Sequence, residues 1–185
     1  MYNIDLIKIA NSADIPLQIN GLYVESFPGE ERRPWGDIRR RIDGGDPYFN
    51  FYVLQHKSEN VGFVTIWNLP GNIYVEHFAV SAERRGGGFG ADVVKRLISE
   101  EGLRSIGLPC KPLLLEVELP EASEEAARRV RFYTRNGLTA LEDVPYFQPP
   151  YVDGLPDVPM MLMVSERPED PVSMARVLHA IVYNQ

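Results

Sequence analysis

The chain has 185 residues, of which 44% are hydrophobic and 24% are charged, and this composition suits one globular domain, residues 1–185, with a sizeable core. The net charge of −7 argues against nucleic acid as the main partner, because phosphate backbones demand a basic protein face. The single cysteine, Cys110, excludes an internal disulfide, and no metal is expected. Because no apolar stretch could span a bilayer and the N-terminus lacks a secretion signal, we expect a cytoplasmic protein without a membrane partner.

The first half of the chain is predicted to form a strand, two helices and a hairpin. The first helix begins near Ile15, where Ser12 or Asp14 could cap it, and it ends at Pro28 because proline and glycine interrupt helices. Its buried side is predicted to comprise Leu17, Leu22, Val24 and Phe27. The remaining elements are a strand over 3–10, a helix over 35–42, and a hairpin with strands over 48–55 and 61–69.

The second half is predicted to alternate strands with helices, which places the chain in the α/β or α+β layered class. Strands are predicted over 73–80, 113–119 and 160–164. Helices are predicted from a glycine-rich run to about residue 101, over 123–136, and over 171–184. The last helix could pack on the domain or form a homodimer interface, and both alternatives stay open.

The glycine-rich run over 84–90 lies between a predicted strand and a predicted helix. Glycines let the backbone turn sharply and approach a ligand closely, and the amides at a helix start attract anions. The run therefore predicts a phosphate site, to which Arg85 adds a positive charge. A nucleotide-hydrolase loop would need Lys-Ser or Lys-Thr where Ala91 and Asp92 stand, and the glycine spacing does not fit a dinucleotide fold.

Arg85, Gly88 and Gly90 form the pattern Arg-x-x-Gly-x-Gly, which resembles the signature of the GNAT superfamily of acyl-CoA-dependent N-acyltransferases. Residues 75–84 and 113–119 are similar to the family's fourth and fifth strands, and residues 131–138 to its later helix motif. The resemblance implies a mixed, mainly antiparallel and strongly bent sheet with helices on both faces. It also implies that parallel strands four and five splay apart to admit the acyl-CoA arm.

The resemblance further implies that the loop amides hold the pyrophosphate of acetyl-CoA, the expected cofactor. Tyr133 matches the family tyrosine beside the CoA sulfur, so we expect it to act as the general acid that protonates the leaving thiolate. A core aromatic residue is the alternative for Tyr133. The expected cofactor-binding residues are Phe78, Ala79, Val80, Arg85, Gly86, Gly87, Gly88, Phe89, Gly90 and Ala91.

Two residues of the strand over 73–80, Glu76 and His77, could serve as the general base. Because side chains alternate along a strand, only one of them faces the cleft unless a bulge intervenes. Glu76 is the favoured base, since its phase matches Phe78 and Val80, which correspond to the family's pantetheine contacts. A solvent-facing carboxylate and a structural histidine are the alternatives for the two residues.

Glu116 and Glu118 share one face of the strand over 113–119. They could bind a cationic substrate or relay a proton, or they could pair with arginines of the helix over 123–136. We favour the structural role for Glu116 and substrate binding for Glu118. Tyr146, in an aromatic and proline-rich segment that could also be a stiff loop, and Trp35 complete the expected acceptor site.

The predicted function is an N-acetyltransferase that transfers the acetyl group of acetyl-CoA directly to a primary amine of a small molecule. A protein or peptide amine is the alternative acceptor, and a non-catalytic acyl-CoA-binding module is the alternative function. No residue pattern names a particular acceptor.

Overall fold

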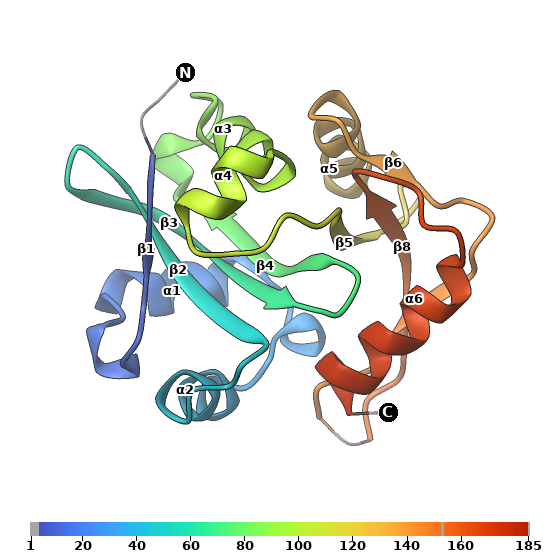
Figure 1. Cartoon of the computed structure of the whole chain (residues 1–185), viewed down its shortest axis with the longest axis horizontal. Helices are drawn as coiled ribbons and strands as arrows, with labels where there is room; N and C mark the ends of the chain where they lie inside the picture. Colours follow the sequence, from blue (N-terminus) through green and yellow to red (C-terminus); the bar gives the residue numbers. More distant parts are fainter. Residues whose placement is uncertain (1–3, 153, 185) are drawn as a thin grey trace.

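The computed structural model describes residues 4–152 and 154–184 and arranges their strands in one sheet of order β1-β2-β3-β4-β5-β8-β6, with β7 beside β8 (Figure 1). The strands are β1 (Asp5–Lys8), β2 (Phe49–His56), β3 (Glu59–Asn68), β4 (Ile73–Val80), β5 (Leu113–Glu118), β6 (Thr139–Ala140), β7 (Tyr146–Gln148) and β8 (Val158–Val164). The helices are α1 (Leu17–Ser26), α2 (Trp35–Asp43), α3 (Phe89–Ile98), α4 (Glu100–Ser105), α5 (Glu124–Arg135) and α6 (Pro171–Leu178). Short turns are η1 (Ser12–Asp14), η2 (Gly29–Glu31), η3 (Ala82–Arg84) and the π turn η4 (His179–Tyr183).

The sheet is antiparallel except where β4 meets β5. These two strands pair in parallel only over 73–75 and 113–115. Beyond that segment β4 continues beside β3, whereas β5 continues beside β8, so the two strands separate toward their C-terminal ends. The predicted fold class, a mainly antiparallel sheet with splayed parallel strands four and five, is confirmed.

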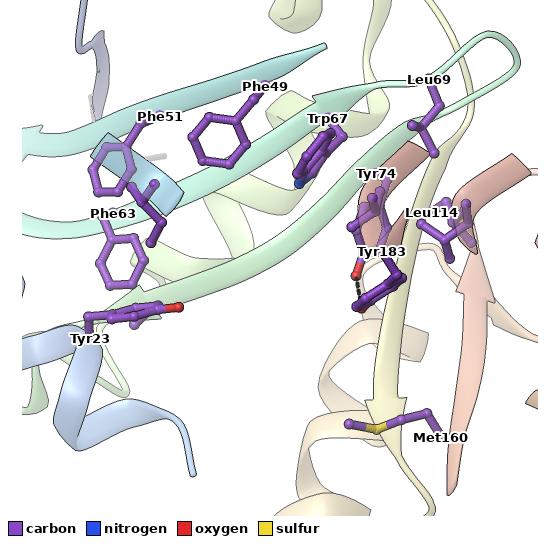
Figure 2. Packing of buried hydrophobic residues seen from close by; sticks show 14 of the residues in the cluster. Tyr23, Phe49, Phe51, Phe63, Trp67, Leu69, Tyr74, Leu114, Met160 and Tyr183 are labelled. Atoms are coloured by element: carbon purple, nitrogen blue, oxygen red, sulfur yellow. Dashed lines mark hydrogen bonds between the residues drawn. The ribbon is translucent and has the colours of Figure 1, made fainter. Parts of the chain in front are cut away.

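Each face of the sheet is covered by helices and buries its own hydrophobic cluster. Helices α1, α2 and α6 lie on one face, and α3, α4 and α5 lie on the other (Figure 1). Neighbouring residues such as Leu114 and Leu115 enter opposite clusters, as the alternation of a strand requires. The first cluster is rich in aromatic rings, which Figure 2 shows, among them Tyr23, Phe49, Phe51, Phe63, Trp67 and Tyr74.

The first helix differs from its prediction in both its cap and its buried side. Ser12 and Asp14 belong to η1, which Asn11 caps by accepting from the amide of Ala13, and α1 starts after Pro16 without a side-chain cap. The helix buries Ile19 and Tyr23, while Leu17 is 86% exposed and Val24 is 52% exposed. Ile19 and Tyr23 are four residues apart and so share one face of the helix, whereas Leu22 and Phe27 only partly reach the core.

Three local features were not predicted correctly. The hairpin turns at Lys57 and Ser58, whose φ angles of 49° and 66° are those of a tight two-residue turn, so β3 begins earlier than expected. The helix after the glycine run breaks at Ser99, which caps α4 by accepting from the amide of Gly102. The aromatic segment around Tyr146 is partly strand, because β7 pairs with β8.

The C-terminal element packs on its own chain. Asp170 caps α6, and the buried side chains of this element are Met174, Leu178, Val182 and Tyr183. Figure 2 shows Tyr183 beside Tyr74, where the two phenols share a hydrogen bond. Within the described ranges, no helix combines the length and the apolar character that crossing a membrane requires.

Candidate active site

A β-bulge in β4 decides which side chains face which side of the sheet. Thr65 pairs with His77 and Ile66 pairs with Val75, so Glu76 is the extra residue of the bulge. The Thr65 hydroxyl lies within hydrogen-bond distance of both the Glu76 carboxylate and the His77 ring, and the His77 amide donates to it. Glu76 therefore shares a face with His77.

The expected phase of Glu76 is wrong for the same reason. Phe78 and Val80 pack on the opposite cluster, the one that contains Val75. A regular strand would have placed Glu76 with them, but the bulge shifts the alternation by one residue. A bulge is the one exception to the alternation expected of this strand, and β4 has one.

A cavity of about 840 Å³ opens where β4 and β5 separate. Its wall includes residues from both faces of the sheet, such as Tyr133 from one cluster and Ala79 from the other. The cavity thus passes between the splayed strands. We call the side formed by the glycine run, α3 and α5 the donor side, and the side formed by α1, η2, β7 and Tyr151 the acceptor side.

The charged residues in the cavity wall are sorted by side. The arginines of the wall lie on the donor side; they are Arg84, Arg85, Arg128, Arg129 and Arg135. Among the described residues of the wall, Glu125 is the one carboxylate on this side. The other wall carboxylates come from α1, η2, β4 and β5; they are Glu25, Glu31, Glu76, Glu116 and Glu118. An anion is favoured on the donor side and a cation on the acceptor side.

The glycine run has the geometry of an anion cradle. Gly86 and Gly88 have φ angles of 76° and 87°, in the left-handed region that favours glycine, and Gly88 is the N-cap of α3. The amide of Asp92 donates to the carbonyl of Gly88, so the amides of Gly90 and Ala91 point out of the helix start. A Cβ at Gly90 would lie 3.2 Å from the Phe132 ring, so a larger residue there would require this ring to shift.

Most of the predicted cofactor-binding residues line the cavity. Gly87 is the exception, because it lies in the loop outside the described wall. Arg85 donates through its Nε to the carbonyl of Val80, which holds its guanidinium at the end of β4. The predicted residues in the wall are Phe78, Ala79, Val80, Arg85, Gly86, Gly88, Phe89, Gly90 and Ala91.

Tyr133 projects from α5 into the cavity wall as a buried, neutral phenol. The residue is 8% exposed, and burial raises the pKa of its hydroxyl to about 12. In the part of the chain that the structure describes, this hydroxyl makes no hydrogen bond. A phenol with an uncommitted proton beside a cavity can donate that proton to a developing anion.

Glu76 is held in a buried ion pair. The Arg33 guanidinium lies 2.8 Å from its Oε1, the Tyr151 hydroxyl donates to the same oxygen at 3.1 Å, and neither charged side chain is more than 3% exposed. Burial would raise the pKa of Glu76, but the charge of Arg33 and the His77 ring outweigh it and hold the pKa well below its usual range. The role of base stays a prediction, and this environment makes Glu76 a weak proton acceptor.

His77 has a structural environment. Its Nε2 lies 2.9 Å from the Glu31 carbonyl and 3.3 Å from the Tyr23 hydroxyl, and its ring packs edge-on against Phe27. These contacts use both ring nitrogens, together with the Thr65 hydroxyl at Nδ1. His77 therefore fixes α1 and η2 against β4.

Glu116 is surrounded by phenols. Tyr146 donates to its Oε1, and Tyr183 donates to its Oε2 at 2.9 Å. Burial raises the pKa of Glu116 to about 7, although the phenol hydrogen bonds oppose the rise. The Tyr183 oxygen also lies 3.3 Å from the Tyr74 hydroxyl, which can donate to it, and 3.3 Å from the Tyr151 hydroxyl, which donates to Glu76, so these phenols join the surroundings of Glu116 to those of Glu76.

The three expected acceptor residues occupy different places. Glu118 lines the cavity and pairs with Arg129 of α5, as in the alternative prediction of a pair with an arginine of that helix. Tyr146 holds Glu116 from behind the wall. Trp35 packs into the core against Tyr23, at 4.9 Å between ring centroids, and the described wall does not include it.

Several wall residues had no sequence signal. The amide nitrogen of Gln148 and the hydroxyl of Ser26 are buried in the wall with no partner among the described residues. Burial and the nearby charge of Glu118 raise the pKa of Glu31 to about 7. These residues meet only because distant segments fold together.

Across the described ranges, no group of three His, Cys, Asp or Glu side chains is placed to hold a metal ion.

Comparisons with known proteins agree with this geometry. Residues 47–138 match the model of the acetyltransferase (GNAT) domain family. A solved structure from Bacteroides thetaiotaomicron, described as a GNAT-family acetyltransferase, is 34% identical with a TM-score of 0.82 and covers 99% of both chains. The chain belongs to the GNAT acetyltransferase family. A search of curated proteins finds no match.

More distant relatives of this GNAT acetyltransferase share its fold. One is a GNAT-family acetyltransferase from Elizabethkingia anophelis with acetyl-CoA bound, at 16% identity and a TM-score of 0.56, covering 89% of this chain and 99% of the other. Another is a chimera of the spermidine N-acetyltransferase SpeG from Vibrio cholerae and hSSAT, at 16% identity and a TM-score of 0.59, covering 88% and 95%.

The family match covers the two sides of the cavity unequally. It includes the glycine run, α3 and Tyr133, and so the whole donor side. It leaves out α1, η2, β7 and Tyr151, which form the acceptor side of this GNAT acetyltransferase, although the wall carboxylates Glu76, Glu116 and Glu118 lie within the matched segment.

Proposed function

We propose that this GNAT acetyltransferase transfers the acetyl group of acetyl-CoA directly to a primary amine of a small molecule. The observation that carries the proposal is the cavity between β4 and β5, with arginines on its donor side and carboxylates on its acceptor side. A thioester that enters from the donor side meets an ammonium attracted to the acceptor side, at the place where the strands separate.

The donor side suits the pyrophosphate of CoA. The amides at the start of α3 and the guanidinium of Arg85 supply hydrogen bonds and positive charge. The separated ends of β4 leave backbone near Phe78 and Val80 for the pantetheine arm. The acetyl-CoA bound to the Elizabethkingia relative supports this choice of cofactor.

The acceptor side suits a small amine. Its wall includes Phe27, Gln148, Tyr151 and Met160, which line the cavity near the carboxylates. The buried amide nitrogen of Gln148 has no partner among the described residues and can bind a polar group of a small acceptor. The spermidine acetyltransferase named among the relatives acts on an amine of this kind.

The proposal is tested by following thiol release from acetyl-CoA with a panel of small amines and peptides. We expect turnover with small amines, and turnover with peptides alone would contradict the small-molecule acceptor. Thermal-shift measurements with CoA, ATP and NAD give a second readout, in which CoA stabilises the protein by binding only its folded state. Stabilisation by CoA without turnover on any amine would favour a binding module.

Tyr133→Phe tests the general acid. Removing the hydroxyl leaves the departing thiolate without its proton donor, so we expect kcat to fall by about a hundredfold while the KM for acetyl-CoA stays unchanged. Steady-state kinetics measure both constants. Tyr48→Phe removes a phenol from an exposed tyrosine outside the cavity wall and should leave both constants unchanged. Equal kcat values for the two variants would show that Tyr133 is not the acid.

A further inference from the structure

The phenols around Glu116 connect it to the C-terminal element, and this arrangement suggests a proton acceptor on β5. We propose that Glu116 takes the proton from the acceptor ammonium and that Tyr183, in η4, is the positioning residue that holds it. The inference rests on the proposed transfer to an amine. It gives the role of base to a residue for which the sequence favoured a structural role.

The contacts of Glu116 leave its charge uncompensated. Tyr146 and Tyr183 each donate to a different carboxylate oxygen, so the side chain is fixed in one orientation. Among residues 4–152 and 154–184, no arginine, lysine or histidine lies within ion-pair distance of it, whereas Glu76 is paired with Arg33. Glu116 lies in the cavity wall, where an acceptor cation would supply the missing charge.

Every element packed around Glu116 contributes a neutral or an acidic group. Tyr74 and Glu76 face it from β4, and Tyr146 faces it from β7. Tyr151 faces it from the loop after β7, and Tyr183 faces it from η4. Its register partner on β8 is the apolar Leu162. Burial and the charge of Glu76 raise the pKa of Glu116, and the phenols moderate the rise to about 7. A base with a pKa near neutrality is well matched to this task.

The reaction balances as follows. The Glu116 carboxylate gains one proton from the ammonium, which becomes a neutral amine. The amine nitrogen then forms a bond to the thioester carbon, and the carbon–sulfur bond breaks. The sulfur leaves as a thiolate and gains a proton from Tyr133, and the phenol recovers it from the nitrogen as the amide forms. Glu116 returns its proton to solvent, so the products are the acetamide, CoA thiol and one proton.

The test is the pH dependence of kcat/KM with an amine that the wild type acetylates. Because the base must be ionised, the wild-type value should fall as the pH drops below about 7. Glu116→Gln should lower kcat/KM at pH 8 by at least about a hundredfold and abolish this acid limb. Glu76→Gln should keep the fall of kcat/KM below about pH 7. Glu169→Gln, at an exposed position, is the matched control and should change neither this fall nor kcat/KM at pH 8.

Tyr183→Phe separates positioning from overall structure. It keeps the ring but removes a hydrogen bond that stabilises the ionised carboxylate, so the acid limb should move to higher pH rather than disappear. An acid limb that persists in Glu116→Gln, or one that is lost in Glu76→Gln alone, would overturn the assignment of Glu116 as the base. An acid limb that is unchanged in Tyr183→Phe would overturn the positioning role of Tyr183.

A readout without turnover keeps the inference distinct from the proposed function. Carboxyl-selective NMR titration of the wild type should show two glutamates that titrate near pH 7, Glu31 and Glu116. The signal of Glu116 is the one that should be missing from Glu116→Gln, while that of Glu31 should remain. If the Glu116 signal is present but no amine is acetylated, the proposed function fails while the assignment of the titrating group stands. If amines are acetylated and Glu116→Gln retains its acid limb, only the inference fails.

Discussion

Glu76 and Glu116 lie on neighbouring strands and line one cavity, yet their surroundings lower the pKa of Glu76 and raise the pKa of Glu116. A buried guanidinium beside Glu76 favours the charged form, whereas burial among phenols disfavours the charged form of Glu116. Position on a strand therefore says little about which carboxylate can act as a base. Burial and the nearest charged group determine the pKa of each carboxylate.

Arg33→Met tests the buried ion pair at the residue scale. The change leaves the Glu76 carboxylate buried without its partner, so we expect the free energy of unfolding to fall by about 3–5 kcal/mol at pH 7. Because the folded-state pKa of Glu76 is depressed, the pair stabilises the fold above the ordinary value of 4.5, and this contribution is lost as the pH falls further. The difference between variant and wild type should therefore shrink in acid.

Urea unfolding at several pH values measures the effect of Arg33→Met. Arg40→Met is the matched control, because Arg40 pairs with Asp37 on the surface and is 74% exposed. An exposed pair contributes less than about 1 kcal/mol, so the control should show a small and nearly constant change. A similar cost for both substitutions would contradict the role given to the buried pair.

At the scale of elements, the glycine run works because its backbone adopts angles that other residues resist. Gly86 has a φ of 76°, and a Cβ there would meet no atom within 4 Å. The conformation alone, rather than lack of space, requires glycine at this position. The angle sets the direction in which the amides at the start of α3 point.

Gly86→Ala should weaken binding of acetyl-CoA without altering the chemistry. Strain of about 1 kcal/mol displaces the loop amides, so the KM for acetyl-CoA should rise roughly fivefold while kcat stays constant. Gly21→Ala is the matched control, since it also has open space but sits in α1. It should leave KM unchanged and stabilise the helix by about 0.5–1 kcal/mol. Equal KM values for acetyl-CoA in the two variants would show that the backbone angle of Gly86 does not contribute to binding.

At the scale of the whole molecule, the C-terminal element joins the two halves of the acceptor side. Arg33 donates to the carbonyl of Val182, and Tyr183 reaches Tyr74, Tyr151 and Glu116. A segment at the end of the chain thereby holds the side chains around both cavity carboxylates. The fold of the acceptor side depends on this element being packed.

Leu178→Ala tests that packing. Leu178 is fully buried against the aromatic cluster, so its truncation should lower the free energy of unfolding by about 2–5 kcal/mol. Val172→Ala, at an exposed position of the same helix, should change it by less than about 0.5 kcal/mol. Urea unfolding at two protein concentrations provides the measurement. A loss that depends strongly on concentration would place α6 between copies of the chain instead.

Local patterns predicted much of this structure. The run of β-branched and aromatic residues over 73–80 matches β4, the helix carrying Tyr133 was placed within a residue at each end, and the glycine run lies at a strand-to-helix junction. The errors arose where tertiary contacts override local preference. The buried face of α1 is the one whose Tyr23 packs against Phe63 of β3 and His77 of β4, and β7 forms by pairing with β8.

The sequence by itself determined the layered class and the anion site at the glycine run, because both depend on short-range patterns of apolar residues and glycines. Its resemblance to the GNAT family supplied the splayed sheet and the choice of CoA for the donor side. Only the tertiary structure decided the acceptor side. There the bulge at Glu76, the ion pair with Arg33 and the phenols around Glu116 bring together segments from both ends of the chain. The acidity of a buried carboxylate depends on neighbours that are distant in sequence, so spacing alone could not distinguish Glu76 from Glu116.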